Sequence, residues 1–306
     1  MRTLSIALSC WVGCVSLADA APLKVVATLS TFADLVETVG GDRVEVTHIA
    51  SPKFNPHFID PKPSDVLNVK RADLFVHAGL DLELWRFPLV DAAGNARARP
   101  GGDGELDLSQ GIRLLEVPQD NVSRAEGDIH MFGNPHYWTN PENAKVMARS
   151  IAKKLSELDP AGAAGFEERA QAFLDRVDRK IPQWRERIEA AGVKEVVAYH
   201  NSWPYLMEFL GLKLDQFVEP KPGVPPSPRH LDFMTNYIKE QDIPVIIQSQ
   251  YFSLRKTKML AKRTNATIAP LVQNVAESKE TSDYVAMVEY NVETVSRACE
   301  AHAKGD

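Results

Sequence analysis

The chain has 306 residues, of which 44% are hydrophobic and 25% charged, and its formal net charge is −6. This is an ordinary globular composition, and the acidic balance argues against nucleic-acid binding. The length is sufficient for two domains of about 120–150 residues each.

The first twenty residues predict a cleavable export signal. A positive start, Met1-Arg2, precedes an apolar run over 4–17, and Ala18-Asp19-Ala20 fits the small-x-small cleavage pattern. The apolar run is too short for a membrane span, so we expect a periplasmic protein. Cleavage leaves Cys299 as the one cysteine of the mature chain, which excludes an intramolecular disulfide and leaves the role of Cys299 open.

Short apolar runs alternate with helical patterns through the first half of the chain. The runs predict strands at 23–29, 44–49 and 74–77, and the patterns predict helices at 32–40, 63–72 and 81–90. Such alternation is typical of a parallel sheet with helices on both faces. A Gly-rich loop at 91–106, a short strand at 112–115 and a polar loop at 119–128 are expected next.

Two long helices follow, and the alternation then resumes. Residues 141–158 and 161–191 predict the long helices, and Pro182 predicts a kink in the second. Strands are expected at 195–199, 213–218, 244–248 and 268–272, and helices at 203–209, 231–240, 256–264 and 283–297. The predicted fold is therefore α/β, with two lobes joined by a long backbone helix. The expected boundaries are a signal peptide at 1–20, an N-terminal lobe at 21–140, connecting helices at 141–191 and a C-terminal lobe at 192–306.

Three histidines lie where strands give way to loops or helices. His57 and His136 occur in Asn-Pro-His motifs, and His200 directly follows an apolar strand. Ligands of open α/β sheets bind beyond the carboxyl ends of strands, and imidazole is the commonest protein ligand for transition metals. The three residues therefore predict one metal site in the cleft between the lobes. His130, six residues before His136, is a further candidate donor.

Three segments resemble motifs of one family. These are Asn55-Pro56-His57-Phe58-Ile59-Asp60-Pro61-Lys62-Pro63-Ser64-Asp65, Asn134-Pro135-His136-Tyr137-Trp138-Thr139-Asn140-Pro141 and Ala198-Tyr199-His200-Asn201-Ser202-Trp203. They are similar to segments of the periplasmic solute-binding proteins of zinc and manganese ABC importers, the cluster A-I receptors. The resemblance covers nearly the whole mature chain. It implies two α/β lobes with the metal between them, a permease of the inner membrane as partner, and a monomeric receptor that is not an enzyme.

The resemblance places His57, His136 and His200 at the family's three nitrogen-ligand positions. The family's fourth ligand is normally a carboxylate after the last strand, where this chain has Gln273 and Asn274. The fourth donor stays open between water, His130, Gln273 and Asn274. Three neutral imidazoles favour Zn²⁺ over Mn²⁺, which prefers oxygen, while Cu²⁺ also accepts nitrogen.

Side chains that could orient the ligands, and alternative functions, also follow from these residues. Asp60, Asp65 and Glu219 are candidate partners for the ligand imidazoles. Three histidines with an open position also fit a zinc hydrolase, although a His-Glu-x-x-His helix is absent from the sequence. An adhesin or a metallochaperone is a third class of function.

Overall fold

The structure is a computed structural model that describes residues 21–118 and 130–304. The expected export signal and the polar segment 119–128 lie outside the described residues. Within the described stretches, no helix is long and apolar enough to cross a membrane.

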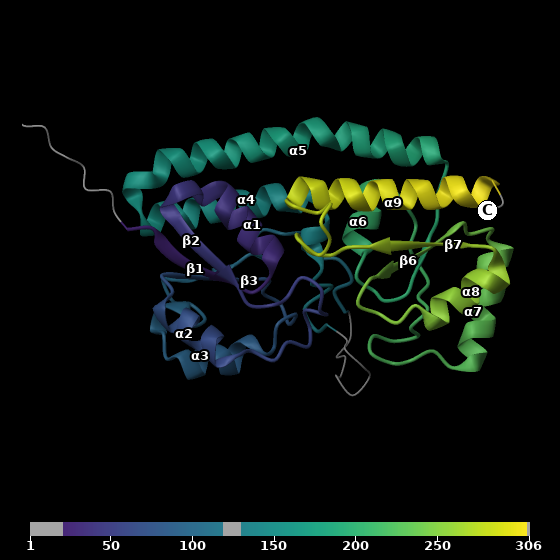
Figure 1. Cartoon of the computed structure of the whole chain (residues 1–306), viewed down its shortest axis with the longest axis horizontal. Helices are drawn as coiled ribbons and strands as arrows, with labels where there is room; N and C mark the ends of the chain where they lie inside the picture. The colour runs from purple at the N-terminus through teal and green to yellow at the C-terminus, as the bar shows by residue number, and fades with distance from the viewer. Residues whose placement is uncertain (1–20, 119–129, 305–306) are drawn as a thin grey trace, which may run out of the picture.

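The N-terminal lobe is a parallel sheet with the strand order β2-β1-β3-β4, covered by helices on both faces (Figure 1). Its elements are β1 (Leu23–Ala27), α1 (Ser30–Gly40), β2 (Val44–His48), α2 (Pro63–Arg71), β3 (Leu74–His77), α3 (Arg86–Ala93), β4 (Glu105–Asp107) and α4 (Pro141–Leu158). Successive β1 residues pack on opposite faces: Val25 joins the core cluster under α1 and α4, and Val26 joins the cluster under α2 and α3. This burial on both faces explains why the strands appear as continuous apolar runs.

The C-terminal lobe repeats this arrangement around a smaller parallel sheet with the order β5-β6-β7. Its elements are β5 (Val197–Ala198), α6 (Pro204–Leu210), α7 (Pro228–Glu240), β6 (Val245–Ser249), α8 (Arg255–Thr264), β7 (Thr267–Leu271) and α9 (Tyr284–Lys304). Ile246 faces α7 and α8, whereas Ile247 faces the core shared with α9. The two-lobe α/β prediction is confirmed.

A single long helix, α5 (Ala163–Ala191), runs along both lobes beside α9 (Figure 1). Its apolar residues recur at helical spacing, from Phe166 through Val177 and Trp184 to Ile188, and all of these are buried. The helix continues through Pro182. One buried cluster contains residues of both sheets, α5 and α9, so the lobes share a continuous core. The precise boundaries predicted for the lobes and connecting helices stay a prediction.

Four local predictions were wrong. The strand expected at 112–115 is absent, and the sheet instead gains β4 at the end of the loop expected at 91–106. Two of the three β4 residues are acidic, so the apolar pattern missed this edge strand, while Ile112 is buried by packing on the core without strand pairing. The strand expected at 213–218 is reduced to isolated bridges at Lys213 and Phe217, and the helix expected from 81 begins at Arg86.

Candidate metal centre

The structure brings the three predicted histidines together although they are far apart in the sequence. One ring nitrogen from each of His57, His136 and His200 lies within 4.8 Å of those of the other two. The Nε2 atoms of His57 and His136 are 3.1 Å apart. The ring centroids are 5.2 Å apart for His57 and His136, and 6.1 Å from each of these to His200. The nitrogens therefore surround a space of the size of one metal ion.

Local structure explains why both Asn-Pro-His motifs direct their histidine side chains into the cluster. The Asn55 side-chain oxygen accepts a hydrogen bond from His57 N at 3.1 Å, and that of Asn134 accepts from His136 N at 3.0 Å. This is the turn that an asparagine forms with the backbone two residues later. In addition, Trp85 Nε1 donates to the Pro56 carbonyl at 2.8 Å and fixes the His57 loop against the lobe.

Two of the rings are oriented through Nδ1. His136 Nδ1 lies 2.9 Å from the Asn134 side-chain oxygen, and His200 Nδ1 lies 2.7 Å from Glu219 Oε2. Because both partners are acceptors, Nδ1 carries the proton and Nε2 keeps its lone pair for a metal. Of the three acids considered as partners, Glu219 therefore contacts a predicted ligand. Asp60 is exposed, and Asp65 accepts from Lys62 N at the start of α2.

Burial favours the neutral form of two of the three imidazoles. It lowers the pKa of His57 and His136 well below the ordinary value of 6.5, and the positive charge that the neighbouring imidazoles would carry lowers both further. Neutral imidazole is the form that binds metal, since a proton and a metal compete for the same lone pair. His57 and His136 are therefore ready to bind a cation at neutral pH.

Glu116 joins the two lobes at the edge of the cluster, and sequence reasoning missed it. Glu116 Oε2 accepts from Asn134 Nδ2 at 2.9 Å and from Asn201 Nδ2 at 2.7 Å. Its backbone has φ 53°, in the left-handed region that costs a non-glycine residue about 1–3 kcal/mol. Glu116 thus holds the asparagine that orients His136, from a strained position that no sequence pattern marks.

The candidate fourth donors differ in their surroundings. The His130 ring lies 5.0 Å from that of His57, centroid to centroid, and its Nδ1 is 2.6 Å from Asp81 Oδ1. Gln273 Nε2 donates to Ser249 Oγ at 2.9 Å, and the Asn274 side-chain oxygen accepts from Thr31. The aromatic residues beside the ligands, Tyr137, Trp138 and Trp203, are all buried in the shared core.

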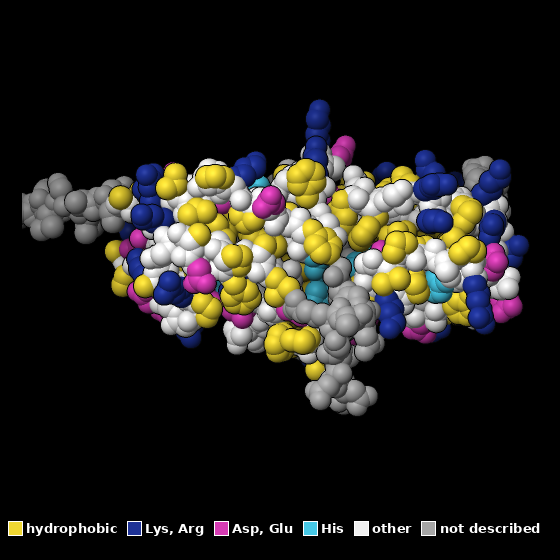
Figure 2. All heavy atoms as spheres, turned by 90° about the horizontal axis from the view of Figure 1, so that it is seen from below, with side chains coloured by type: hydrophobic (Ala, Val, Ile, Leu, Met, Phe, Trp, Pro, Cys, Tyr) yellow, Lys and Arg dark blue, Asp and Glu magenta, His cyan; other side chains and the backbone are white. Residues whose placement is uncertain are grey.

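The cluster opens toward solvent between the lobes. Figure 2 shows histidine side chains in the middle of this face, with hydrophobic side chains next to them. A pocket of about 260 Å³ reaches the cluster, and its lining includes His130 and His200. An ion could therefore enter from this face.

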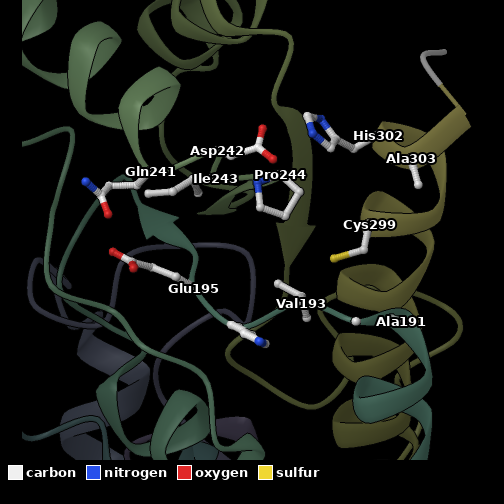
Figure 3. A pocket seen from close by; sticks show the side chains of 12 residues that line it. Ala191, Val193, Glu195, Gln241, Asp242, Ile243, Pro244, Cys299, His302 and Ala303 are labelled. Atoms are coloured by element: carbon white, nitrogen blue, oxygen red, sulfur yellow. The ribbon is translucent and has the colours of Figure 1, made fainter.

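Cys299 lies away from this cleft. It is buried on α9 and lines a separate pocket of about 460 Å³, in which Figure 3 shows its side chain near Pro244 and Val193. Burial raises the pKa of the thiol to about 11, so it stays protonated at neutral pH. The thiol is therefore unsuited to bind the metal, since the thiolate is the ligand form.

Comparison with known proteins identifies the family. A profile of the family described as zinc-uptake complex component A, periplasmic (ZnuA), matches residues 25–298. The chain belongs to this family. It is 25% identical to the manganese ABC transporter substrate-binding lipoprotein PsaA of Streptococcus pneumoniae over 283 residues, 90% of this chain and 88% of PsaA. It is also 25% identical to the iron-binding protein YfeA of Yersinia pestis, over 90% of this chain and 85% of YfeA.

Solved structures agree with this fold. A crystal structure of ZnuA superposes with a TM-score of 0.76 at 22% identity, over 92% of this chain and 99% of that one. The laminin-binding protein Lmb of Streptococcus agalactiae, described as an adhesin with metal-transporting activity, superposes with a TM-score of 0.75 at 25% identity, over 91% and 99%. The chain is thus a metal ABC transporter substrate-binding protein and not an enzyme, and the alternative function as a zinc hydrolase is not favoured.

Proposed function

We propose that this chain is the extracytoplasmic receptor of an ABC importer for zinc. It captures Zn²⁺ in the cleft through His57, His136 and His200 and delivers the ion to a permease of the inner membrane. The observation that carries this proposal is the convergence of three imidazole nitrogens within 4.8 Å of one another.

The donor atoms favour zinc among the metals named for the relatives. Among the described residues, the group of potential ligands around this point contains three imidazoles and no carboxylate. Manganese is a hard ion that prefers carboxylate and water oxygens, whereas imidazole suits zinc. The 3.1 Å separation of the His57 and His136 nitrogens is close to the ~3.3 Å expected for two nitrogens on one tetrahedral zinc. Carboxylates such as Glu219 act through the imidazoles instead, which moderates the positive charge of the bound ion.

The metal content of the protein tests this proposal. The full chain is exported by a bacterial host and purified without chelator. Elemental mass spectrometry is then expected to find one zinc ion per molecule. In competition titrations, manganese is expected to bind orders of magnitude more weakly. A protein that holds mainly manganese or copper overturns the zinc assignment.

Substitutions test the three ligands. His57→Ala, His136→Ala and His200→Ala are each expected to lower zinc affinity by orders of magnitude. The matched control is His302→Ala, because His302 contacts the Asn265 carbonyl at the end of α9, away from the cleft. If any of the three variants binds zinc as tightly as the control, that residue is not a ligand.

A further inference from the structure

A fourth imidazole lies beside the three. The His130 ring centroid is 5.0 Å from that of His57 and 6.0 Å from that of His136. A zinc–nitrogen bond of about 2.0–2.1 Å and a tetrahedral angle place two ligating imidazole centroids about 5.2 Å apart. His130 therefore stands from His57 and His136 at distances like those among the other three rings, which are 5.2 and 6.1 Å. Its ring nitrogens are outside the group that lies within 4.8 Å, so the ring has to approach the other three when the ion binds.

A buried carboxylate orients His130. Asp81 Oδ1 lies 2.6 Å from His130 Nδ1, and Asp81 Oδ2 accepts from Met131 N at 3.0 Å. The Asp81 side chain is 3% exposed and that of His130 is 13% exposed. Because the carboxylate accepts from Nδ1, the proton stays on that atom and Nε2 keeps its lone pair. The pair repeats the arrangement of Glu219 with His200, in which a buried acid holds a ring by Nδ1.

The C-terminal lobe offers weaker candidate donors for the fourth ligand position. The Asn274 side-chain oxygen is engaged by Thr31, and Gln273 Nε2 by Ser249. The nearby acid Glu277 accepts from the amides of Gln273 and Asn274 through Oε2, while its buried Oε1 has no hydrogen-bond partner in the part of the chain that the structure describes. The side-chain oxygen of Gln273 also has no partner within 21–118 and 130–304, so these two oxygens are the competing donors. The oxygen of Gln273 belongs to a neutral amide, a weaker metal ligand than imidazole for zinc.

We propose that His130 is the fourth metal ligand and that Asp81 is its positioning residue. This inference rests on the proposed function, since it concerns the same ion. The N-terminal lobe then supplies His57, His130 and His136, and the C-terminal lobe supplies His200 alone. The coordination is four neutral nitrogens, with negative charge only behind two of the rings.

X-ray absorption at the zinc edge tests the coordination directly. With one equivalent of zinc, the full chain is expected to show scattering from four imidazoles at about 2.0–2.1 Å. His130→Ala is expected to show three imidazoles and one oxygen. A residue with only a structural role would leave this number unchanged, so the readout separates ligation from folding.

Zinc affinity tests the positioning role proposed for Asp81. Asp81→Asn keeps an acceptor but removes the charge, and it is expected to weaken zinc binding about 10–100-fold. His130→Ala is expected to weaken it by ~100-fold or more, and His130→Gln provides a second variant of similar size in case alanine disturbs folding. His302→Ala serves again as the unaffected control.

The outcomes separate this inference from the function on which it rests. If the unaltered chain shows three imidazoles, and His130→Ala binds zinc as tightly as before, His130 is not a ligand while the receptor proposal stands. If the fourth donor disappears in Gln273→Ala instead, the amide is the ligand and the inference is wrong. If the unaltered chain fails to bind zinc, both proposals fall.

Discussion

Replacing Glu219 by glutamine isolates the effect of one buried charge on metal capture. In the structure, Glu219 Oε2 lies 2.7 Å from His200 Nδ1, and the two residues are 8% and 6% exposed. Glutamine can still accept a hydrogen bond from Nδ1, so the ring keeps its place. The hydrogen bond is no longer charge-assisted, however, and the imidazole becomes a weaker donor to the metal.

The expected loss follows from this geometry. Removal of such a carboxylate partner typically lowers metal affinity 10–100-fold, which is about 1.4–2.7 kcal/mol. The pair is almost fully buried and is screened little by salt, so we expect a value in the upper half of that range for Glu219→Gln. Glu219→Ala, which removes the acceptor altogether, is expected to lose at least as much.

Competition between the protein and a chromophoric chelator measures the zinc affinity of each variant near neutral pH. Glu208→Gln is the matched control, because Glu208 is a more exposed glutamate of the same lobe, paired with Arg113. If Glu219→Gln binds zinc within twofold of the unaltered chain, while His200→Ala has lost binding, the carboxylate does not tune the ligand and the reasoning fails.

Three further predictions concern stability. Zinc at about 100 times its dissociation constant is expected to add about 2.7 kcal/mol to the free energy of unfolding. Calorimetry should show a higher Tm that is lost in His200→Ala, and an equal shift in both contradicts the site. Burial raises the pKa of Asp34 from 3.8 to about 7, although Asp34 accepts a hydrogen bond from Tyr284 N. Its contribution to stability is therefore complete below pH 3.8 and lost as the pH rises through about 7. Asp34→Asn should thus stabilise the apoprotein more at pH ~8 than at pH ~5, and a constant difference in Tm refutes this. Trp138 Nε1 donates to the Gln273 carbonyl across the lobes, so Trp138→Phe should lower the free energy of unfolding by about 1–3 kcal/mol in urea titrations. An unchanged midpoint means that this bond contributes nothing.

The sequence predicted the elements whose residues are buried on two faces. β3 and β6 are fully buried, and both begin with apolar runs, at 74–76 and 245–247. β4 pairs with β3 at the sheet edge through Glu105 and Asp107, whose polarity hid it. Edge strands are thus defined by their neighbours more than by their own composition.

At the metal site, contacts between residues close in the chain could be predicted from the sequence, whereas contacts between distant residues could not. Each Asn-Pro-His motif is a local turn, and its residues are adjacent in the chain. Asp81 lies 49 residues from His130, and Glu116 lies 85 residues from Asn201. Such pairs depend on the tertiary fold, within one lobe for Asp81 with His130 and between the lobes for Glu116 with Asn201, and periodicity does not encode it. Asp81 nevertheless lies shortly after the carboxyl end of β3, where the rule for ligand positions could have drawn attention to it.

The spacing of the rings also limits how far the lobes must move. His57 and His136 already stand 5.2 Å apart, close to the ~5.2 Å of a tetrahedral zinc site, whereas His200 stands 6.1 Å from each. Among these three rings, the excess of about 0.9 Å belongs to His200, which comes from the C-terminal lobe. His130, from the N-terminal lobe, stands 6.0 Å from His136 and needs a local shift of similar size. Movement on this scale is compatible with a core shared by both lobes and with ion pairs such as Lys180–Glu289 between α5 and α9. A large hinge motion would break that core, so we expect capture to proceed by a small approach of His200 toward an ion already held by the N-terminal lobe.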